Sequence, residues 1–277
     1  MGFFVFNGTY EPALGVPDGD SVKFVLSEAD IQRLQAVERQ GRPPKVNTAN
    51  GSTTLRFEGI DAMEKSARPA DTANVVTNAT EAMFAALDLD GPDATAPGHI
   101  YTRLLGPFGR PIAFCFPGPA PDDIDNMDDV FLTAERAAES ANAQLLAQGH
   151  AYPLFYTTLF DDLKEMLTAA SAEAETAGLG VWAEDGTTSG VTYGGPDSLA
   201  VLAPLFPKLW RRLQSYTRDE DFEVVAGTLD QFLDFLDMSD DRVFVGDARQ
   251  TTGFDNVVEV AGDVLRLTEH PARLTFV

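Results

Sequence analysis

Two short stretches of the sequence carry the residues whose types and spacing could do chemistry. The first reads Asp18-Gly19-Asp20-Ser21, and the second reads Arg56-Phe57-Glu58-Gly59-Ile60-Asp61-Ala62-Met63-Glu64. Carboxylates gathered at the ends of two neighbouring strands form a hard oxygen-ligand site suited to calcium or magnesium. An arginine fixed beside them could hold a phosphate as a planar, permanently charged fork.

A second arginine follows downstream, in Phe108-Gly109-Arg110. Two arginines, a carboxylate metal site and a spare glutamate are the groups that hydrolysis of a phosphodiester needs. Cations offset the charge that develops on the phosphoryl group, and a carboxylate orients or deprotonates water. The alternative for any one of these stretches alone is a surface turn with solvated charges. The three together, in this order, favour the site.

Strands are expected to position these side chains. Leu55 and Phe57 alternate with Arg56 and Glu58, and this period of two predicts a strand. Turn residues around Gly19 lead into a second expected strand over residues 22–26, and Arg110 precedes a third over residues 111–116.

These stretches resemble the staphylococcal-type thermonuclease family, whose pattern is Asp-Gly-Asp-Thr, then Arg-Leu-x-Gly-Ile-Asp-Ala-Pro-Glu, then Tyr-Gly-Arg. The resemblance continues over residues 142–151, which are similar to a helix ending in Gly-x-Ala, and over residues 172–175 and 178–182, similar to a final Ala-rich helix and its Gly-Leu-Trp ending. In all it spans about residues 9–186. It implies an α+β protein built on an OB-fold, a five-stranded β-barrel with flanking helices.

The resemblance also implies a role for each matching residue. The metal ligands would be Asp20, Asp61 and the backbone carbonyl of Ala62, with calcium as the cofactor and magnesium possible. The scissile phosphate would be gripped by Arg56 and Arg110, and the attacking water handled by Glu64. Asp18 would support the metal site, while Phe108 and Tyr156 would touch the nucleic acid substrate, DNA or RNA. For Tyr156, a packed core tyrosine is an equal alternative.

The sequence departs from the family pattern at three positions. Ser21 keeps the hydroxyl of the usual threonine, Met63 replaces a proline before the glutamate, and Phe108 replaces a tyrosine. Losing the proline loosens the loop that aims Glu64. All charged positions remain, so we expect an active enzyme. The alternative is a catalytically silent OB-fold module that binds nucleic acid or protein.

The net charge of −23 runs against a nuclease, because nucleic-acid-binding proteins usually present a basic surface. The acidic residues are spread along the whole chain. One explanation is a salty cytoplasm, since high salt screens repulsion to within a few ångströms. The other is that the negative field restricts substrates to ends, short strands or single strands.

Composition predicts a globular cytoplasmic protein without a membrane partner. Hydrophobic residues make up 44% of the chain, and no run approaches the length of a membrane helix. The first residues lack the features of a signal peptide. Cys115 is the single cysteine, so no internal disulfide can form, and we expect it in a core strand.

Breaks in the pattern divide the chain at about residue 186 into the thermonuclease-like domain, 1–186, and an extension of unknown role, 187–277. The first part carries an insertion over about 27–50. It begins with a helix that is capped by Ser27 and is expected to end at Gly41. A further helix is expected over 75–87 and loops over 88–98 and 117–128.

The extension reads as α/β. A helical pattern over residues 199–216 is interrupted by two prolines, and an apolar stripe follows over 229–236. Strand-like runs come last, the first two joined as a hairpin at 261–263. With Arg211 and Arg212 it could form a module that binds nucleic acid or a protein partner. We favour the alternative, an appendage packed on the barrel.

Overall fold

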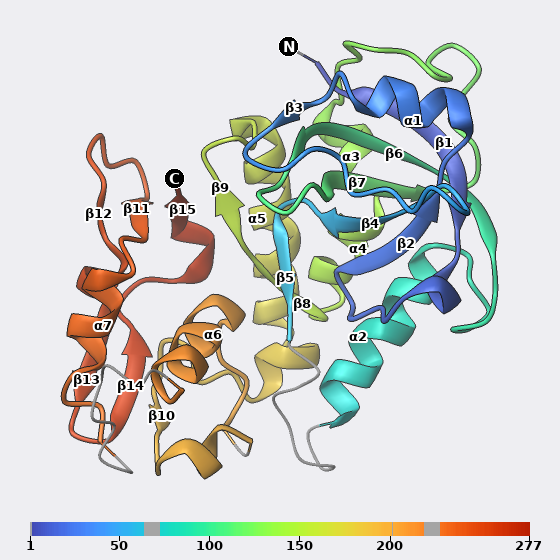
Figure 1. Ribbon diagram of the computed structural model, residues 1–277. Helices are drawn as coiled ribbons and strands as arrows, with labels where there is room; N and C mark the ends of the chain where they lie inside the picture. The colour runs from blue at the N-terminus through green and yellow to red at the C-terminus, as the bar shows by residue number, and fades with distance from the viewer. Residues whose placement is uncertain (1, 64–72, 201, 219–227) are drawn as a thin grey trace.

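The computed structural model describes residues 2–63, 73–200, 202–218 and 228–277. A β-barrel with helices packed around it is followed by a region of short strands and helices at its side (Figure 1). The fold class is α+β, as the sequence predicted. Each helix in the described part of the chain is too short or too polar to cross a lipid bilayer.

Five strands close into the barrel, because the first strand pairs with both β2 and β6. In order around the barrel they are β1 (Phe4–Tyr10), β2 (Ser21–Val25), β4 (Ser52–Phe57), β7 (Pro111–Pro117) and β6 (Ala96–Leu105). Neighbours run antiparallel except β4 and β7, which are parallel. This closed barrel is consistent with the expected OB-fold. The short β3 (Glu38–Arg39) continues the sheet beyond β6.

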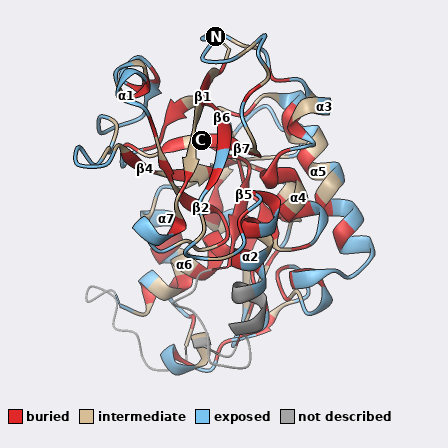
Figure 2. Cartoon of the chain, turned by 90° about the vertical axis from the view of Figure 1, so that its right-hand side faces the viewer, coloured by how far each residue is buried: buried red, intermediate tan, exposed pale blue. Residues whose placement is uncertain are grey.

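The alternation of apolar and charged residues in β4 explains why the Arg56 side chain lies outside the barrel core. Leu55 and Phe57 are 0% and 1% exposed, whereas the side chain of Arg56 between them is 22% exposed. Because successive side chains of a strand point to opposite faces, the apolar pair fills the barrel and Arg56 lies on the other face. Figure 2 shows the barrel strands largely coloured as buried. Cys115 lies in β7 with no exposure, as expected of a core residue.

The start of β6 corrects the loop predicted over residues 88–98, since the strand already includes 96–98. Gly98 looks like a turn residue in the sequence, but here it makes room for a ring. A Cβ atom at this position would lie 2.0 Å from Cε2 of Tyr10. Tyr10 is fully buried, and its hydroxyl donates to the carbonyl of Phe116 at 3.1 Å. The glycine therefore serves the packing of the barrel.

Helices cover the barrel on several sides. They are α1 (Glu28–Leu34), α2 (Ala73–Ala86), α3 (Ala134–Ala137), α4 (Ala141–Ala147) and α5 (Asp161–Thr176), with a 3-10 turn at Pro12–Leu14. The predicted cap of α1 is present, because Ser27 Oγ accepts from the Asp30 N–H at 3.1 Å. This helix ends at Leu34 rather than near Gly41, because the chain then turns to pair β3 with β6. In α2, the residues Ala79 and Met83 of the predicted apolar stripe are fully buried.

In the described part of the chain after residue 186, short strands form a three-stranded sheet and three strands of a four-stranded one, together with two α-helices. Its elements are β10 (Val191–Thr192), α6 (Pro207–Tyr216), α7 (Phe232–Met238), β11 (Arg242–Val245), β12 (Thr252–Gly253), β13 (Val258–Ala261), β14 (Val264–Leu267) and β15 (Leu274–Phe276). Among the described residues of this region, 3-10 turns lie at Pro196–Ala200, Phe254–Val257 and Pro271–Arg273, and a further one lies just before it, at Gly180–Ala183. The predicted hairpin is formed by β13 and β14. The helix expected over 199–216 is confirmed only from Pro207 onward.

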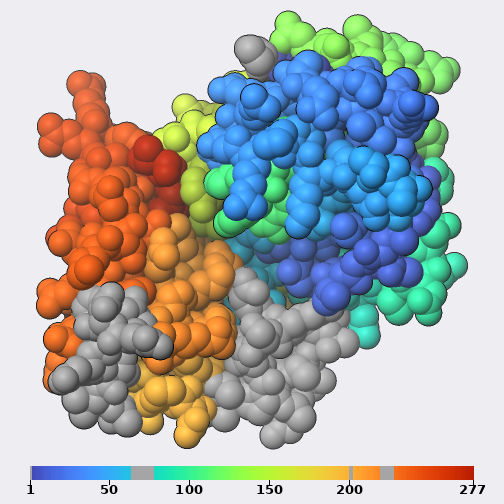
Figure 3. Space-filling model, viewed as in Figure 1, coloured from blue at the N-terminus to red at the C-terminus, as the bar shows by residue number. Residues whose placement is uncertain are grey.

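This C-terminal region shares a sheet and a hydrophobic core with the part before it. Strand β15 pairs in parallel with β9 (Phe155–Tyr156), so the sheet order is β12-β11-β15-β9. Figure 3 shows the orange and red C-terminal residues lying directly against the yellow-green segment that contains β9. A second core, distinct from that of the barrel, joins Tyr152 and Trp182 to Trp210 and Phe276. The division at residue 186 stays a prediction, since the second core draws on both sides of it.

Candidate active site

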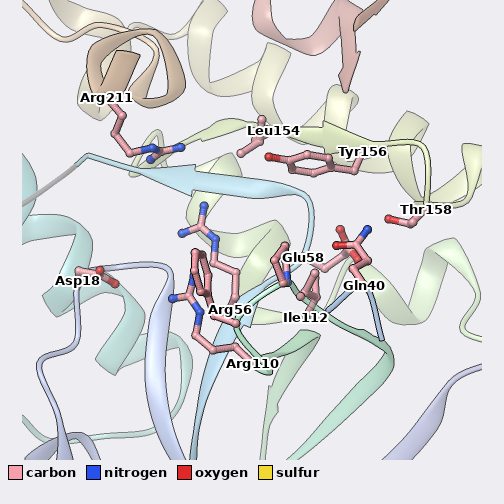
Figure 4. Close-up of a pocket in the computed structure, with 13 residues that line it drawn as sticks. Asp18, Gln40, Arg56, Glu58, Arg110, Ile112, Leu154, Tyr156, Thr158 and Arg211 are labelled. Atoms are coloured by element: carbon pink, nitrogen blue, oxygen red, sulfur yellow. The ribbon is translucent and has the colours of Figure 1, made fainter. Parts of the chain in front are cut away.

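A pocket of about 550 Å³ opens where the barrel meets the C-terminal region. Its lining includes charged side chains from four separate parts of the chain (Figure 4). The lining residues are Asp18, Gln40, Arg56, Glu58, Gly106, Pro107, Phe108, Arg110, Ile112, Leu154, Tyr156, Thr158 and Arg211. Five residues of the predicted site therefore share one pocket: Asp18, Arg56, Phe108, Arg110 and Tyr156.

Asp20 and Asp61, the predicted metal-binding carboxylates, are brought together beneath this pocket. Asp20 precedes β2, and Asp61 lies in β5 (Ile60–Ala62), which pairs with β8 (Ala151–Pro153). The Asp20 carbonyl accepts from the Phe57 N–H at 2.9 Å, and its Oδ2 accepts from the Ala62 N–H at 2.7 Å. Their exposed fractions are only 2% and 0%. The backbone of the motif thus holds two carboxylates side by side, away from water.

Arg56 bridges the two carboxylates. Its Nη1 is paired with Oδ1 of Asp20, and its Nη2 lies 2.6 Å from Oδ1 of Asp61. The same Nη2 donates to the carbonyl of Ile60 at 3.3 Å. The backbone of Arg56 is therefore held in β4 and its guanidinium is held by the two aspartates, while the side chain also lines the pocket.

Arg211 makes the second arginine contact to the carboxylate pair. It lies on α6, and its Nη1 and Nη2 donate to Oδ1 and Oδ2 of Asp61 at 3.0 and 2.8 Å. This is the two-pronged geometry in which a guanidinium matches a carboxylate. From the sequence, Arg211 is expected only as a possible contact of the extension with nucleic acid or a partner. The available signal was a pair of adjacent arginines in an expected helix, and such a pair does not show which groups the arginines contact.

The pKa values of the two aspartates are pushed apart. For Asp61, burial acts to raise the pKa, but the guanidinium groups of Arg211 and Arg56 outweigh it and hold the pKa below its ordinary value. For Asp20, burial dominates and raises the pKa, with Arg56 acting in the opposite direction and the nearby Asp18 adding to the rise. Asp61 is therefore the firmly ionised member of the pair.

Glu58 is a carboxyl group of the pocket to which the sequence analysis gave no role. It stands two positions after Arg56, just beyond the end of β4, and is 5% exposed. Burial raises its pKa to about 7, although Arg103 and Arg56 act to lower it. The alternation in the sequence could have indicated this position, because residues two apart in a strand lie on the same face, and Glu58 should therefore lie on the face of Arg56.

Arg110 and Phe108 lie in the turn between β6 and β7, at the pocket rim. Gly109 has a φ of +75°, and a Cβ there would lie 2.1 Å from the carbonyl oxygen of Pro43. The glycine thus lets the turn pack against the insertion, whose Lys45 N–H donates to the Gly109 carbonyl at 2.9 Å. Phe108 is 63% exposed. An exposed ring beside an arginine at a pocket mouth could stack on a base.

Two further predicted residues line the pocket. Tyr156 lies in β9, with its ring 6.0 Å from that of Phe276, and burial raises its pKa. In Figure 4 its hydroxyl points across the pocket toward the side of Arg211. Asp18 accepts a hydrogen bond from Ser21 Oγ, so the hydroxyl kept at position 21 fixes this carboxylate. Glu64, the residue expected to handle water, lies outside the described residues.

The donor set fits a hard cation in its chemistry, with two buried carboxylates and the adjoining backbone of Ala62. All four carboxylate oxygens, however, accept N–H groups from Arg56, Arg211 or Ala62. Among the described residues, no cluster of three or more His, Cys, Asp or Glu side chains could hold a metal ion. A cation at Asp61 would therefore have to share these oxygens with the guanidinium groups or compete with them for the oxygens.

A scan against models of known protein families finds no match to this chain, and no curated protein matches it.

Proposed function

We propose that this protein is a metal-dependent nuclease of the thermonuclease type, which hydrolyses phosphodiester bonds of DNA or RNA. The observation that carries the proposal is the convergence of Arg56, Arg110 and Arg211 on one pocket above two buried carboxylates. Phosphoryl transfer is accelerated chiefly by fixed positive groups placed around the transferring phosphate. Two of these arginines were expected from the motif, and the third comes from the extension.

The roles follow from where each group lies. Arg56 approaches the pocket from β4 and Arg110 from the turn before β7, so they can contact one phosphate from two sides. When bound at Asp20 and Asp61, a calcium or magnesium ion would supply Lewis-acid polarisation of a phosphoryl oxygen. Phe108 and Tyr156 offer ring faces and a hydroxyl to the flanking nucleotides. For Glu64 we propose the role that the resemblance of residues 56–64 implies, which is to orient or deprotonate the attacking water.

Glu58 adds a proton-transfer group to this proposal. A general acid or base works best when its pKa lies near the working pH. The carboxyl of Glu58, with a pKa of about 7, meets that condition and lines the same pocket as Arg56 and Arg110. It can take a proton from water or return one to the leaving oxygen.

Two observations favour the second candidate, a catalytically silent OB-fold module that binds nucleic acid or a protein. Arg56 and Arg211 already neutralise the carboxylates that would hold a metal. A net charge of −23 also disfavours contact with nucleic acid outside the arginine-lined pocket. Under this proposal the pocket binds an anion without cleaving it.

A cleavage assay separates the two. Single- and double-stranded DNA and RNA are incubated with the wild type in calcium, magnesium or EDTA, across a series of salt concentrations. We expect cleavage that depends on the metal, and loss of about 10²–10³ in rate for Arg110→Gln, which removes one preorganised donor. Arg42→Gln is the matched control, because Arg42 is exposed and lies outside the pocket lining. Binding without cleavage under every condition would support the silent module instead.

A further inference from the structure

Most of the pocket is built from parts of the chain that contain no acidic residue. The four longest stretches of sequence without Asp or Glu hold ten of the 20 Lys and Arg residues and none of the 43 acidic ones. They are residues 39–57, 94–121, 140–160 and 198–218. Apart from Asp18 and Glu58, every described residue that lines the pocket comes from one of them. An acidic chain thus places half of its cations in the segments that meet at one pocket, which draws anions there.

The insertion carries positive charge beyond the pocket rim. Its backbone runs beside the end of β6 and the turn after it, since the Gln40 N–H donates to the Leu105 carbonyl at 3.0 Å. The Lys45 N–H donates to the Gly109 carbonyl at 2.9 Å. Gln40 and Phe108 line the pocket, whereas Lys45 is exposed and lies outside the lining. Lys45 therefore belongs to the surface next to the pocket.

Lys23 lies on the face of the barrel that carries Arg56. In the pairing of β2 with β4, Lys23 is opposite Thr54. Thr54 and Arg56 are two residues apart in β4, so both lie on one face together with Lys23, which is about 7 Å along the strand direction from Arg56. The carbonyl of Lys45 accepts from Thr53 Oγ1 at 3.0 Å, which holds Lys45 beside the same strand.

The charges of Lys23 and Lys45 are not neutralised by a carboxylate. Among the described residues neither lysine forms an ion pair, whereas Lys164 on α5 lies 3.0 Å from Asp161. Burial, and after it the charge of Lys45, lowers the pKa of Lys23. A carboxylate beside Lys23 would raise that pKa. The two ammonium groups therefore repel each other, and an anion bound between them would relieve the repulsion.

Three acidic residues lie on the segments next to the two lysines. Asp18 accepts from Ser21 Oγ and lines the pocket. Glu11 is joined to Lys23 through a backbone hydrogen bond, and Glu38 is exposed in β3. Within the part of the chain that the structure describes, none of the three forms an ion pair with a lysine. An anion bound by the two lysines would not have to displace a carboxylate.

We propose that Lys23 and Lys45 form a second phosphate-binding position next to the arginine pocket, which holds the neighbouring phosphate of a single-stranded nucleic acid. This inference rests on the proposed function, which places the reacting phosphate at Arg56 and Arg110. Proteins bind single strands with a positively charged groove along the backbone and with aromatic rings that stack on bases. The ring of Phe108, 63% exposed at the pocket rim, is available for such stacking.

The charge of the rest of the molecule favours a single strand over a duplex. Outside the four acid-free stretches the chain carries all 43 acidic residues and only ten Lys and Arg residues. A duplex would bring the phosphates of its second strand toward this surface, where repulsion acts over about 10 Å at 0.1 M salt. A single strand needs only the pocket and the two lysines beside it.

The affinity for single-stranded DNA tests the second position, measured in EDTA so that metal-dependent cleavage does not interfere. The fluorescence anisotropy of a labelled oligothymidylate of about eight nucleotides is followed between about 50 and 200 mM salt. A cation that contacts one phosphate of a single strand contributes about 0.7 to the slope of log K against log salt concentration. We expect Lys23→Gln and Lys45→Gln each to reduce the slope by about this amount and to weaken binding about 8-fold at the lowest salt concentration.

Lys164→Gln is the matched control. It removes the same charge from a lysine that is already paired with Asp161, so the slope and the affinity should stay close to those of the wild type. Lys45→Arg keeps the charge and should keep the slope. Lys23→Gln and Lys45→Gln relieve a repulsion, so neither should lower the unfolding temperature. A lower unfolding temperature together with weaker binding would mean that the lysines support the fold, and would count against the inference.

Three results would overturn the inference: slopes of both glutamine variants equal to that of Lys164→Gln, a duplex of the same length bound by the wild type as tightly as the single strand, or no binding of the oligothymidylate. None of these measurements involves cleavage. Failure of the nuclease proposal would appear as intact substrate in the cleavage assay, whereas failure of the second phosphate position would appear in the binding measurements.

Discussion

The side-chain amide of Asn142, on α4, holds the backbone of Glu58 at the edge of the pocket, with Nδ2 2.8 Å from the Glu58 carbonyl oxygen. The same amide nitrogen donates to the carbonyl of Ala113 at 3.0 Å, and Oδ1 accepts from the Cys115 N–H at 3.0 Å. Asn142 is fully buried. One side chain therefore joins the end of β4 to β7, the parallel strand pair that carries Arg56 and follows Arg110.

Replacing Asn142 should weaken the whole fold. Asn142→Ala leaves the Glu58 carbonyl and the Cys115 N–H without this partner, each at a cost of roughly 1–3 kcal/mol, whereas the Ala113 carbonyl still accepts from the Glu58 N–H, so we expect a loss of about 3–5 kcal/mol in the free energy of unfolding. Denaturant unfolding measures it as a lower midpoint with an unchanged slope. Gln144→Ala on the same helix is the control, since Gln144 makes one exposed contact to the Glu139 carbonyl. Equal midpoints for the two variants would contradict the role given to Asn142.

Glu58 should make stability depend on pH. Its pKa of about 7 in the folded protein lies above the ordinary value of 4.5, so the folded state binds the proton more tightly than the unfolded state. Stability contributed by this proton is fully present below about pH 4.5 and is lost as the pH rises through about 7. The difference in pKa corresponds to about 3 kcal/mol. Glu58→Gln should remove this dependence and be the more stable protein at pH 8, as urea unfolding at pH 5 and pH 8 would show.

The same variant bears on catalysis. If Glu58 takes a proton from water, the cleavage rate of the wild type should rise with pH through about 7. Glu58→Gln should lose that rise while keeping its affinity for nucleic acid. An unchanged pH profile in the variant would remove Glu58 from the mechanism and leave its effect on stability intact.

Arg56 and Arg110 should respond differently to the same substitution. Lysine keeps the charge but loses the fork. Arg56→Lys disturbs a buried pair of aspartates, so we expect both a lower unfolding temperature and a rate loss of about 10²-fold or more. Arg110→Lys, in the turn at the pocket rim, should show the rate loss with a smaller change in unfolding temperature than Arg56→Lys, because Arg110 is only half-buried. Circular dichroism melts and single-turnover cleavage separate these effects, and an equal loss of stability in both would be evidence against the contrast.

The C-terminal strand should be needed for the fold. Phe276 is 1% exposed and packs with its ring 5.3 Å from that of Phe254 and 6.0 Å from that of Tyr156. Phe276→Ala should therefore cost about 3–5 kcal/mol. The adjacent Val277 is 68% exposed, and Val277→Ala should be neutral. If Phe276→Ala unfolds at the same denaturant concentration as Val277→Ala, the C-terminal region does not support the pocket.

How far the sequence alone could go depends on the distance between interacting residues. Strand β4 was predictable because its alternation is local, and the capped start of α1 likewise needs only Ser27 and Asp30. Strand β6 was missed at its start because Gly98 resembles a turn residue until the ring of Tyr10 is placed against it. The order of the motifs indicated that Arg56 and Arg110 should meet.

The remainder of the site arises from long-range packing. Arg211 and Asp61 are 150 positions apart, and no local pattern encodes their contact. The pKa of Glu58 depends on how deeply the turn after β4 is buried, which the neighbouring sequence does not specify. The role expected of Glu64 stays a prediction.

The hydrophobic core that joins Tyr152 and Trp182 to Trp210 and Phe276 affects how the molecule melts. Two independent domains would unfold in two steps, each at its own temperature. Here β9 is paired with β15, so unfolding of the C-terminal region would expose the apolar side chains of the part before it, and the reverse also holds. A calorimetric scan should accordingly show a single cooperative peak, and the pocket should disappear together with the barrel rather than before it.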